Sequence, residues 1–445
     1  MKTKTLIGRR NNKLGIALCG VLAAGTLAMI PTTSAQNGSP AKVLAMQTLP
    51  PLSLLYFGQT AEELATAAAN GLNRDDLPAI GSGLQRLAGN HYLGITDRGP
   101  AFPRTTPSPG RVFPMPSYTP HLVFFRAQGD QLVLQALTPL VIDDAGTPVT
   151  CLPNSATDDT VPFATFTDTI ALPFNPNGLD PEDVHTLPDG RFLVVDEYSP
   201  SVAIVSESGK VLKRHIPLGK SLPGAACAVS DNLPAVLSNR RSSRGFECIA
   251  VSGDGKTAYT MTQSPLGPTG NGTPTRLSRV LRVLRLDVSD PLNTHVTGQF
   301  VLLMSPASTY PAGNRPQDLK LSSADWVSEN KLLLLERSDE LGIGGVKLVL
   351  ADLANATDVT SLPIAQTMAL EDSNLDLASV GITPISTTVV YRNEETPEVD
   401  DFKLEGLAIL NRNTVAMIND NDFGTGVPLE ATSKMWVIRL SESLP

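Results

Sequence analysis

The sequence predicts an all-β protein of the β-propeller class. Five stretches repeat one pattern: an apolar strand that opens on or near an acid, a turn at Gly, Asn or Asp, and a second apolar strand that ends in an acid. Further strand-like runs follow these hairpins, and helical signal is thin, with residues 60–70 as the best candidate. Strands at this spacing without intervening helices exclude a Rossmann or TIM architecture and leave a sandwich array or a propeller. The repetition favours the propeller, because hairpins stacked radially bury faces that one hairpin cannot bury alone.

The five copies determine the expected number of blades. The clearest copy runs from Glu182 to Glu197, and the others cover residues 83–99, 247–259, 324–337 and 404–420. Copies begin roughly 65 to 100 residues apart, well beyond the ~40 residues of a simple blade, and long loops absorb part of the excess. We expect six blades, within a range of five to seven, and closure of the ring by pairing of residues 435–440 with residues in 43–57.

The first 35 residues have the features of a secretory signal peptide. A basic start precedes an apolar stretch at 14–30, and small residues then offer a cleavage site before Gln36. The protein is therefore predicted to be secreted, to the periplasm or the extracellular space. Residues 36–74 are expected to form an N-terminal segment that partly joins the propeller, and residues 75–445 the propeller domain. No second apolar run reaches membrane-spanning length, and a monomer is expected.

The charge balance limits the possible partners. The chain has 35 Lys and Arg against 44 Asp and Glu, and because five of the basic residues and no acid lie in residues 1–35, the mature chain carries a net charge of −14. Nucleic acid is not expected as a partner, since its phosphates require a basic face. Metal cations are compatible with this charge, and so is a plain solvated acidic surface.

Three cysteines remain in the mature chain. Cys151 and Cys227 lie in loop-like sequence, whereas Cys248 lies within a strand pattern. One disulfide and one leftover thiol are expected in an oxidising compartment. We therefore predict a Cys151–Cys227 disulfide and a buried, inert Cys248.

Acids recur at matched positions of the repeat. The innermost strands of a propeller line a central channel, so residues at one edge of every blade converge on a common mouth. Converging carboxylates repel one another unless they are protonated, paired or bridged by cations, and calcium prefers ligands of this kind. We predict a calcium site at this mouth; the alternative is that each acid caps its own hairpin or pairs with a local Arg. The matched acids are Glu182, Glu247, Asp325 and Glu405 at one strand start and Asp97, Glu197, Glu336 and Asp420 at the other strand end.

Arginines accompany three of the repeats. Arg98 and Arg337 directly follow acids of the pattern, and Arg244 precedes Glu247 by three residues. A guanidinium group can hold a phosphate or a carboxylate through two parallel hydrogen bonds. These arginines are candidates for orienting an anionic substrate; the alternative is that each neutralises a neighbouring acid. No Gly-x-Ser-x-Gly elbow, Walker A loop or His-Glu-x-x-His motif is present, so the corresponding enzyme classes are unsupported.

An ordered series of motifs resembles that of a known family. The motifs are Asp97-Arg98-Gly99-Pro100, Pro181-Glu182-Asp183, Asn239-Arg240, Arg244-Gly245-Phe246-Glu247, Leu335-Glu336-Arg337 and Leu404-Glu405-Gly406-Leu407. Over roughly residues 75–440 they look like the secreted "esterase-like activity of phytase" family. The resemblance implies a β-propeller with phosphoester-hydrolysing activity, through a distant likeness to calcium-dependent propeller phytases. Two departures are Cys248, where a small Gly is expected, and the first repeat, which opens on Gly83 without an acid.

The residues and the resemblance together lead to one hypothesis and two alternatives. The hypothesis is a secreted, calcium-dependent hydrolase of small-molecule phosphoesters, in which arginines orient the phosphate and an unligated carboxylate acts as general base. The alternatives are a non-catalytic propeller that binds a ligand or a protein, and a propeller hydrolase of lactones or carboxylic esters. The predicted catalytic residues are Asp97, Arg98, Arg244 and Arg337. The predicted metal ligands are Glu182, Glu197, Glu247, Glu336, Glu405 and Asp420, with Asp97 as a further candidate.

Overall fold

The structure is a computed structural model of the 445-residue chain. It describes residues 39–156, 160–338, 344–401, 403–425 and 432–445. The predicted signal peptide, residues 1–35, lies outside the described residues. Within the described part of the chain, no helix is long and apolar enough to cross a membrane.

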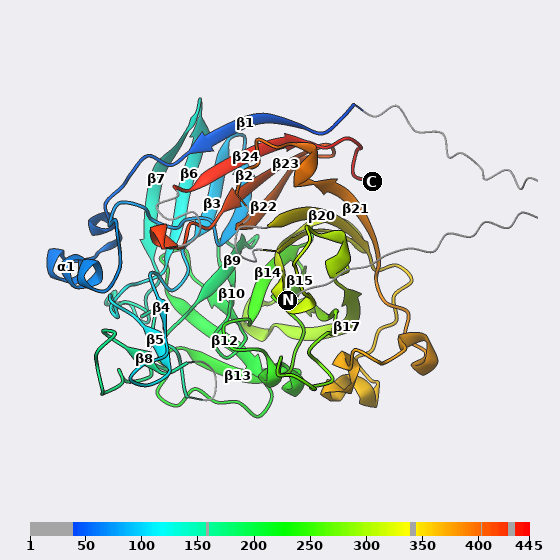
Figure 1. The fold of residues 1–445 in the computed structure, drawn as a ribbon, viewed down its shortest axis with the longest axis horizontal. Helices are drawn as coiled ribbons and strands as arrows, with labels where there is room; N and C mark the ends of the chain where they lie inside the picture. Colours follow the sequence, from blue (N-terminus) through cyan, green and yellow to red (C-terminus); the bar gives the residue numbers. More distant parts are fainter. Residues whose placement is uncertain (1–38, 157–159, 339–343, 402, 426–431) are drawn as a thin grey trace, which may run out of the picture. The chain divides into compact units, whose positions relative to one another are not determined.

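The strands of residues 39–445 form sheets that radiate from a common centre (Figure 1). From the centre outward, the sheets are β2 (Gly83–Ala88), β3 (His91–Ile95), β6 (His121–Gln128) and β7 (Gln131–Pro139); β9 (Pro181–Thr186), β10 (Phe192–Asp196), β11 (Ser201–Val205), β12 (Val211–Pro217) and β13 (Ala228–Leu233); β14 (Phe246–Val251), β15 (Thr257–Thr262), β16 (Val280–Asp287) and β17 (His295–Leu303); β18 (Leu319–Ser328), β19 (Lys331–Ser338), β20 (Gly345–Asp352) and β21 (Ser386–Arg392); and β22 (Leu404–Asn411), β23 (Thr414–Asn419), β24 (Lys434–Arg439) and β1 (Lys42–Thr48).

The innermost strands close a ring. Strand β2 contacts β9, β9 contacts β14, β14 contacts β18, β18 contacts β22, and β22 contacts β2 again. Each innermost strand begins one of the repeated hairpins, so the predicted all-β propeller is confirmed. In the described residues the ring holds five radial sheets, which lies within the expected range, and the preferred number of six is not confirmed.

Connections, rather than a further blade, take up the excess length of the repeats. The segment after the first hairpin contributes to a small separate sheet of β4 (Phe102–Arg104), β5 (Gly110–Val112) and β8 (Pro162–Phe163). The connection between β20 and β21 contains the short 3₁₀ turns Pro363–Gln366, Met368–Glu371 and Leu377–Val380. The repeat length therefore overstates the number of blades.

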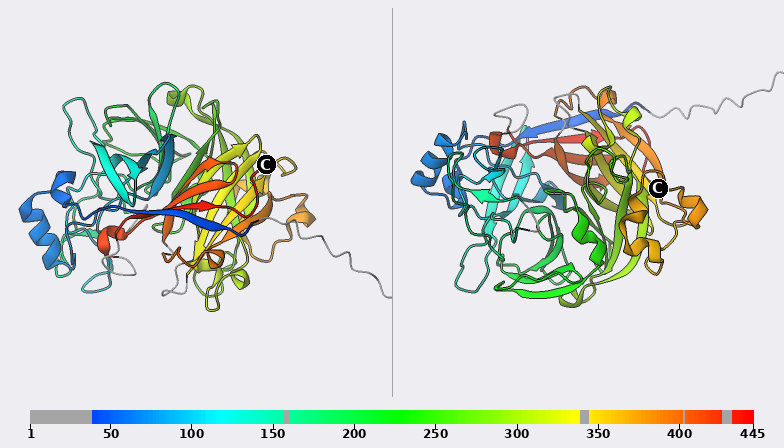
Figure 2. Two further views of the ribbon diagram at one scale, coloured as in Figure 1. Left: turned by 90° about the horizontal axis from the view of Figure 1, so that it is seen from above. Right: turned by 60° about the horizontal axis from the view of Figure 1, so that its bottom comes forward.

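The N-terminal segment closes the ring, as predicted. Strand β1 pairs with β24 in antiparallel register, with Lys42 opposite Arg439 and Thr48 opposite Lys434. The predicted helix is α1 (Ala61–Ala69), whose cap residue Thr60 exchanges hydrogen bonds with Glu63. It lies at the periphery, outside the radial sheets (Figure 2).

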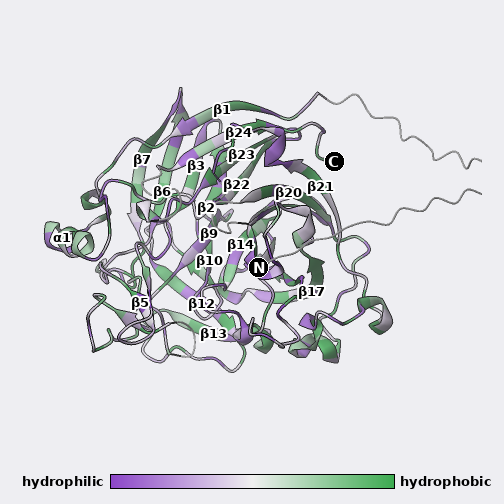
Figure 3. Ribbon diagram, in the orientation of Figure 1, coloured by the Kyte–Doolittle hydropathy of each residue, from purple (hydrophilic) through white to green (hydrophobic). Residues whose placement is uncertain are grey.

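Each pair of neighbouring sheets shares one hydrophobic cluster, and the strands are coloured mainly as hydrophobic in Figure 3. Alternation along β19 shows how this arises, because Leu332 and Leu334 pack toward the third sheet whereas Leu333 and Leu335 pack toward the fifth. An inner strand buried on both faces must be apolar at successive positions, which explains the runs of Leu and Val in the sequence.

The predicted Cys151–Cys227 disulfide is not present. Cys151, Cys227 and Cys248 are all free thiols in the structure. Cys151 belongs to the cluster between the first and fifth sheets, and its thiol lies 3.4 Å from the carbonyl of Met115. Cys227 packs against a different cluster, between the first and second sheets. The loop sequence around both cysteines gave no information on which side of the first sheet each would lie.

Two buried aspartates connect adjacent blades. Asp183 in β9 accepts a hydrogen bond from the amide of Ile249 in β14 at 3.0 Å, and Asp325 in β18 accepts one from Ile409 in β22 at 2.7 Å. Gly83 leaves room for the first of these carboxylates, since a Cβ there would lie 2.5 Å from it. These residues serve the ring itself, so the prediction that Asp325 converges on the central mouth is wrong.

The substitution Asp325→Ala is expected to lower the free energy of unfolding by about 1–3 kcal/mol, because the buried amide of Ile409 loses its acceptor. Urea denaturation measures this loss. The control is Asp144→Ala, since the Asp144 side chain is 89% exposed and pairs with Lys210 only at the surface. Equal stability of the two variants would contradict the role of Asp325 as an inter-blade contact.

Candidate functional site

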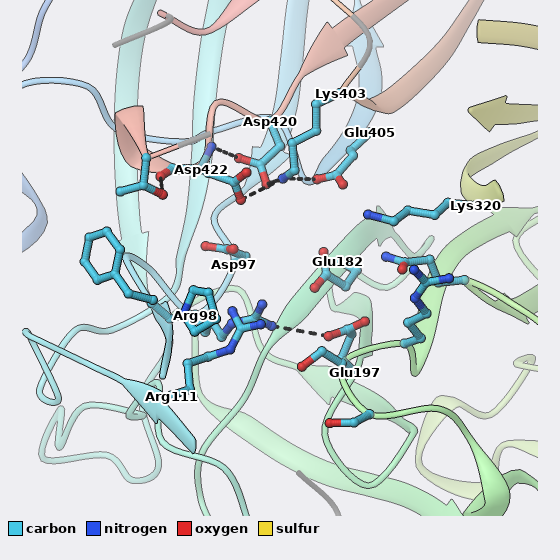
Figure 4. Close-up of a pocket in the computed structure, with 18 residues that line it drawn as sticks. Asp97, Arg98, Arg111, Glu182, Glu197, Lys320, Lys403, Glu405, Asp420 and Asp422 are labelled. Atoms are coloured by element: carbon cyan, nitrogen blue, oxygen red, sulfur yellow. Dashed lines mark hydrogen bonds and ion pairs between the residues drawn. The ribbon is translucent and has the colours of Figure 1, made fainter. Parts of the chain in front are cut away.

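A cavity of about 550 Å³ lies where the innermost strands begin, at the centre of the ring (Figure 4). Its wall is rich in charged side chains of both signs. The acidic residues that line it are Asp97, Glu182, Glu197, Glu405, Asp420 and Asp422, and the basic residues are Arg98, Arg111, Arg244, Lys320 and Lys403.

β-Bulges produce the first set of acids. In the second sheet Pro181 pairs with Asp196 and Asp183 pairs with Val195, which leaves Glu182 as an extra residue in its strand. The same interruption isolates Glu247 in β14 and Glu405 in β22. A bulge re-aims the side chain of the extra residue and so lets a strand that is otherwise buried in the core direct a carboxylate to the centre. Glu182 and Glu405 line the cavity.

The fourth sheet follows the same rule with different residues. Its bulge lies between Leu321 and Ser323, so Ser322 takes the place that Glu182 has in the second sheet. This correction moves Asp325 three positions away from the matched site. The repeat pattern in the sequence could not reveal the shift, because a bulge adds one residue without changing the apolar character of its strand.

The second strands of the hairpins supply the other set. Glu197 and Asp420 each follow the residue paired with the start of the inner strand, and Asp97 occupies the same position after β3. In the fourth sheet Glu336 pairs with Leu321, so Arg337 holds the position equivalent to Glu197.

The structure does not bring Glu336 to the cavity. Its carboxylate is fully buried beside Tyr310, whose hydroxyl donates to Oε2 at 3.0 Å, and it also accepts from the amide of Ser305. A one-residue change of position reverses the direction of a strand side chain. The predicted ligand role of Glu336 therefore fails on its position in the strand.

Glu247 and Arg337 lie behind the cavity wall. Glu247 is 1% exposed and accepts a hydrogen bond from Gln263 at 2.7 Å, while its Oε2 is buried without a partner. Arg337 is fully buried and donates to Ser322 and to Glu405. Its position makes it a support for Glu405 rather than a group that reaches a substrate.

Lys403 neutralises one side of the cavity. Its ammonium lies 3.2 Å from Glu405 Oε2, 2.5 Å from Asp420 Oδ2 and 2.9 Å from Asp422 Oδ1 (Figure 4). Burial opposes ionisation of Glu405, but Lys403 and Arg337 outweigh it and hold the pKa of that carboxyl at about 2. A built-in cation thus occupies the centre of this group of acids.

Arg98 neutralises part of the opposite side. Its guanidinium donates to Asp180 and lies 3.2 Å from Glu197 Oε2, and its backbone amide donates to Asp180 at 3.2 Å. Glu197 Oε1 is buried without a partner. Burial, followed by the charges of Glu247 and Glu197, raises the pKa of Glu182 well above its usual value. This side therefore carries more carboxylate than its single arginine can satisfy.

The donor set on this side suits a hard divalent cation. Carboxylate oxygens of Asp180, Glu182 and Glu197 lie within 4.8 Å of one another, and the unpartnered oxygen of Glu197 belongs to this group. Calcium binds carboxylate oxygens in clusters of this kind. Asp97, Asp420 and Asp422 form a second group within the same distance, but the Lys403 ammonium already contacts two of its members.

Asp97 stands between these two groups (Figure 4). Its Oδ1 accepts a hydrogen bond from the Gly99 amide at 2.7 Å. Burial raises the pKa of Asp97 to about 6, although Arg98 and Lys403 favour its ionised form. A carboxylate with this pKa is half ionised in weakly acidic solution, which suits acid–base chemistry.

Sequence reasoning missed five charged residues of the site: Asp180, Arg111, Lys320, Lys403 and Asp422. Asp180 and Lys403 each stand two residues before a bulged glutamate. That shared position in the repeat was an available signal. Arg111 comes from β5, outside the hairpins, and no repeat pattern points to it.

The fold and the site define a class: a β-propeller with a deep central cavity of mixed charge. The chain belongs to the phytase-like family, whose description is "Esterase-like activity of phytase" and whose model matches residues 79–423.

Among individual proteins, an uncharacterized secreted protein of Arthroderma benhamiae is 32% identical over 133 residues, and the match covers 26% of each chain. Two solved structures are similar at low identity. A luciferin-regenerating enzyme has a TM-score of 0.34 at 10% identity, with 82% of this chain and 92% of that chain covered. The PQQ-bound aldose sugar dehydrogenase of Streptomyces coelicolor has a TM-score of 0.33 at 8% identity, with 90% and 100% covered.

The substitution Lys403→Met is expected to destabilise the protein by about 3–5 kcal/mol at pH 7.5, because it leaves buried carboxylates without their cation. Glu405 has a folded pKa of about 2, below its ordinary value of 4.5, so the stability it contributes is present above pH 4.5 and is lost as the pH falls toward 2. The deficit of the variant should therefore shrink between pH 4.5 and pH 3. Urea denaturation at several pH values measures it.

Lys331→Met is the matched control, since Lys331 pairs with Asp352 at the surface. A deficit in Lys403→Met that is the same at pH 3 and pH 7.5 would contradict the assigned charge network.

Proposed function

We propose that this protein is a secreted phosphoester hydrolase whose reaction takes place in the central cavity with the help of one divalent cation. One observation carries the proposal: the same cavity presents buried carboxylate oxygens that lack partners and basic side chains suited to an anion. Family membership supports a hydrolase of this kind. Secretion is supported by the predicted signal peptide and by the printed name of the Arthroderma relative.

Substrate binding follows from the charges. A phosphate group entering the cavity would be repelled by the acids alone. Arg98, Arg111, Arg244 and Lys320 line the cavity and offer guanidinium and ammonium donors for its oxygens. A small phosphoester fits the volume of about 550 Å³, whereas a neutral ester would leave these donors without an anionic partner.

The cation would be held by Asp180, Glu182 and Glu197. When bound, calcium would neutralise charge on the phosphate and polarise its phosphorus–oxygen bonds. The protein residues do the rest: Arg98 orients the phosphate from a position fixed by Asp180 and Glu197, and Lys403 keeps the other acids neutralised.

Asp97 is assigned as the general base. It takes a proton from a water molecule as the water oxygen forms a bond to phosphorus. The bond between phosphorus and the ester oxygen breaks, and the departing alkoxide takes a proton from solvent at the cavity mouth. The products are inorganic phosphate and an alcohol.

Release of inorganic phosphate tests the proposal. Phytate, glycerol phosphate and p-nitrophenyl phosphate are incubated with the protein in calcium and in chelator, beside a panel of lactones and carboxylic esters. Calcium-dependent phosphate release is expected. Turnover of the lactones or carboxylic esters alone would favour the other hydrolase class, and no turnover by a calcium-loaded protein would favour a binding propeller.

The pH dependence of this reaction is a separate prediction. The base must be ionised, so kcat/KM should rise about tenfold per pH unit below pH 6 and level off above it, as the pKa of about 6 of Asp97 requires. Asp97→Asn should lower kcat by about 10²–10⁴-fold. Asp254→Asn, on an exposed turn, is the control. An unchanged acidic limb in Asp97→Asn would contradict the assignment.

Thermal melting tests the cation site without reference to activity. Calcium at a hundred times its Kd should stabilise the wild type by about 2.7 kcal/mol, and Glu182→Gln should lose this gain. Glu336→Gln should keep it, whatever its own melting temperature, because Glu336 faces away from the cavity. Loss of the calcium response in Glu336→Gln but not in Glu182→Gln would reverse the assignment.

A further inference from the structure

A second cavity of about 540 Å³ adjoins the first and takes no part in the proposed reaction. Ser242 lines both cavities, so they share a wall. The loop that precedes β14 forms one side of the second cavity, and the segment 267–270 forms another. The side chains that matter for its chemistry are Arg240 and Arg241.

Arg241 is fixed in place but not fully satisfied. The residue is 8% exposed. Its Nε donates to the carbonyl of Gly267 at 3.1 Å and its Nη2 to the carbonyl of Thr275 at 3.0 Å. Its Nη1 is buried and has no acceptor. Two neutral carbonyls thus hold a charged group in position without neutralising it.

Arg240 is in a similar state. Its Nη1 donates to the carbonyl of Arg241 at 3.0 Å, while Nε and Nη2 are buried without acceptors. A single hydrogen bond leaves this side chain able to turn toward a ligand. Leaving a buried donor without an acceptor costs about 1–3 kcal/mol, and more for a charged group.

The acids nearest to these arginines are already engaged. Glu371 is fully buried and receives two hydrogen bonds from Arg282, at 2.5 and 2.8 Å. Asp196 is paired with Arg214 at 2.6 Å. Within the described part of the chain, neither Arg240 nor Arg241 has a carboxylate within ion-pair distance.

The two cavities therefore differ in sign. Acids and bases both line the central cavity, whereas no acid among the described residues lines the second. Burial, followed by the charge of Arg244, lowers the pKa of Arg241 to about 10, as expected for a cation that lacks its counter-ion.

We propose that Arg240 and Arg241 form a second anion site that binds a tetrahedral oxyanion of the phosphate or sulfate type. The guanidinium fork matches two oxygens of such an ion. The bound ion would meet the three donors that the protein leaves without acceptors, with Ser242 and Thr269 available as further polar groups at the wall. This proposal concerns binding only and does not depend on hydrolysis in the central cavity.

Calorimetric titration of the purified protein with inorganic phosphate, in chelator, tests the site. Wild type should bind at the second cavity, and Arg240→Gln should weaken that binding at least tenfold. Arg98→Gln, which alters only the central cavity, should leave it intact. Arg285→Gln should also leave it intact, because Arg285 lies elsewhere and already has Asp358 at 3.9 Å. A parallel titration with sulfate distinguishes a general oxyanion site from one selective for phosphate.

Two results would overturn the proposal. One is equal phosphate affinity in wild type and Arg240→Gln. The other is phosphate binding that Arg98→Gln abolishes entirely, which would place all of it in the central cavity. If Arg240→Gln fails to fold, Arg240→Lys keeps the charge but removes the fork, and it should bind phosphate more weakly than wild type; unchanged affinity there would count against the site equally.

Discussion

The structure depends on one extra residue at the start of an innermost strand. These strands are buried on both faces, and regular alternation would direct every side chain into the clusters between sheets. The bulges at Glu182, Glu247 and Glu405 break that alternation where the strands approach the centre. They allow a strand built of Val, Ile and Leu to deliver a carboxylate to the axis of the ring without loss of its apolar core.

Charge balance then decides what the centre can do. Carboxylates gathered in a buried cavity need positive partners, and the chain provides some of them itself. Lys403 serves the group around Asp420, and Arg337 supports Glu405 from behind. On the other side Arg98 is shared between Asp180 and Glu197, and oxygens of Glu197 and Glu247 remain unpartnered. This uneven compensation is why the proposed function assigns one divalent cation, on the Glu182 side only.

Much of this arrangement could be predicted from the sequence. The repeated hairpins led to the propeller and to ring closure by β1, and they brought Asp97, Arg98 and Arg244 to the cavity. Errors arose where position depends on register: Glu336 lies one residue from the matched position, and Asp325 binds a neighbouring blade. The number of blades and the basic residues outside the hairpins depend on how long loops fold back, and no periodic pattern records that.

The most direct test of the central claim is a crystal structure of the protein soaked with calcium and vanadate, read by anomalous scattering. We predict one calcium peak among Asp180, Glu182 and Glu197, with vanadate between that ion and Arg98. Calcium bound at Asp420 in place of the Lys403 contact, or a central cavity that holds neither ion while both bind elsewhere, would contradict the account.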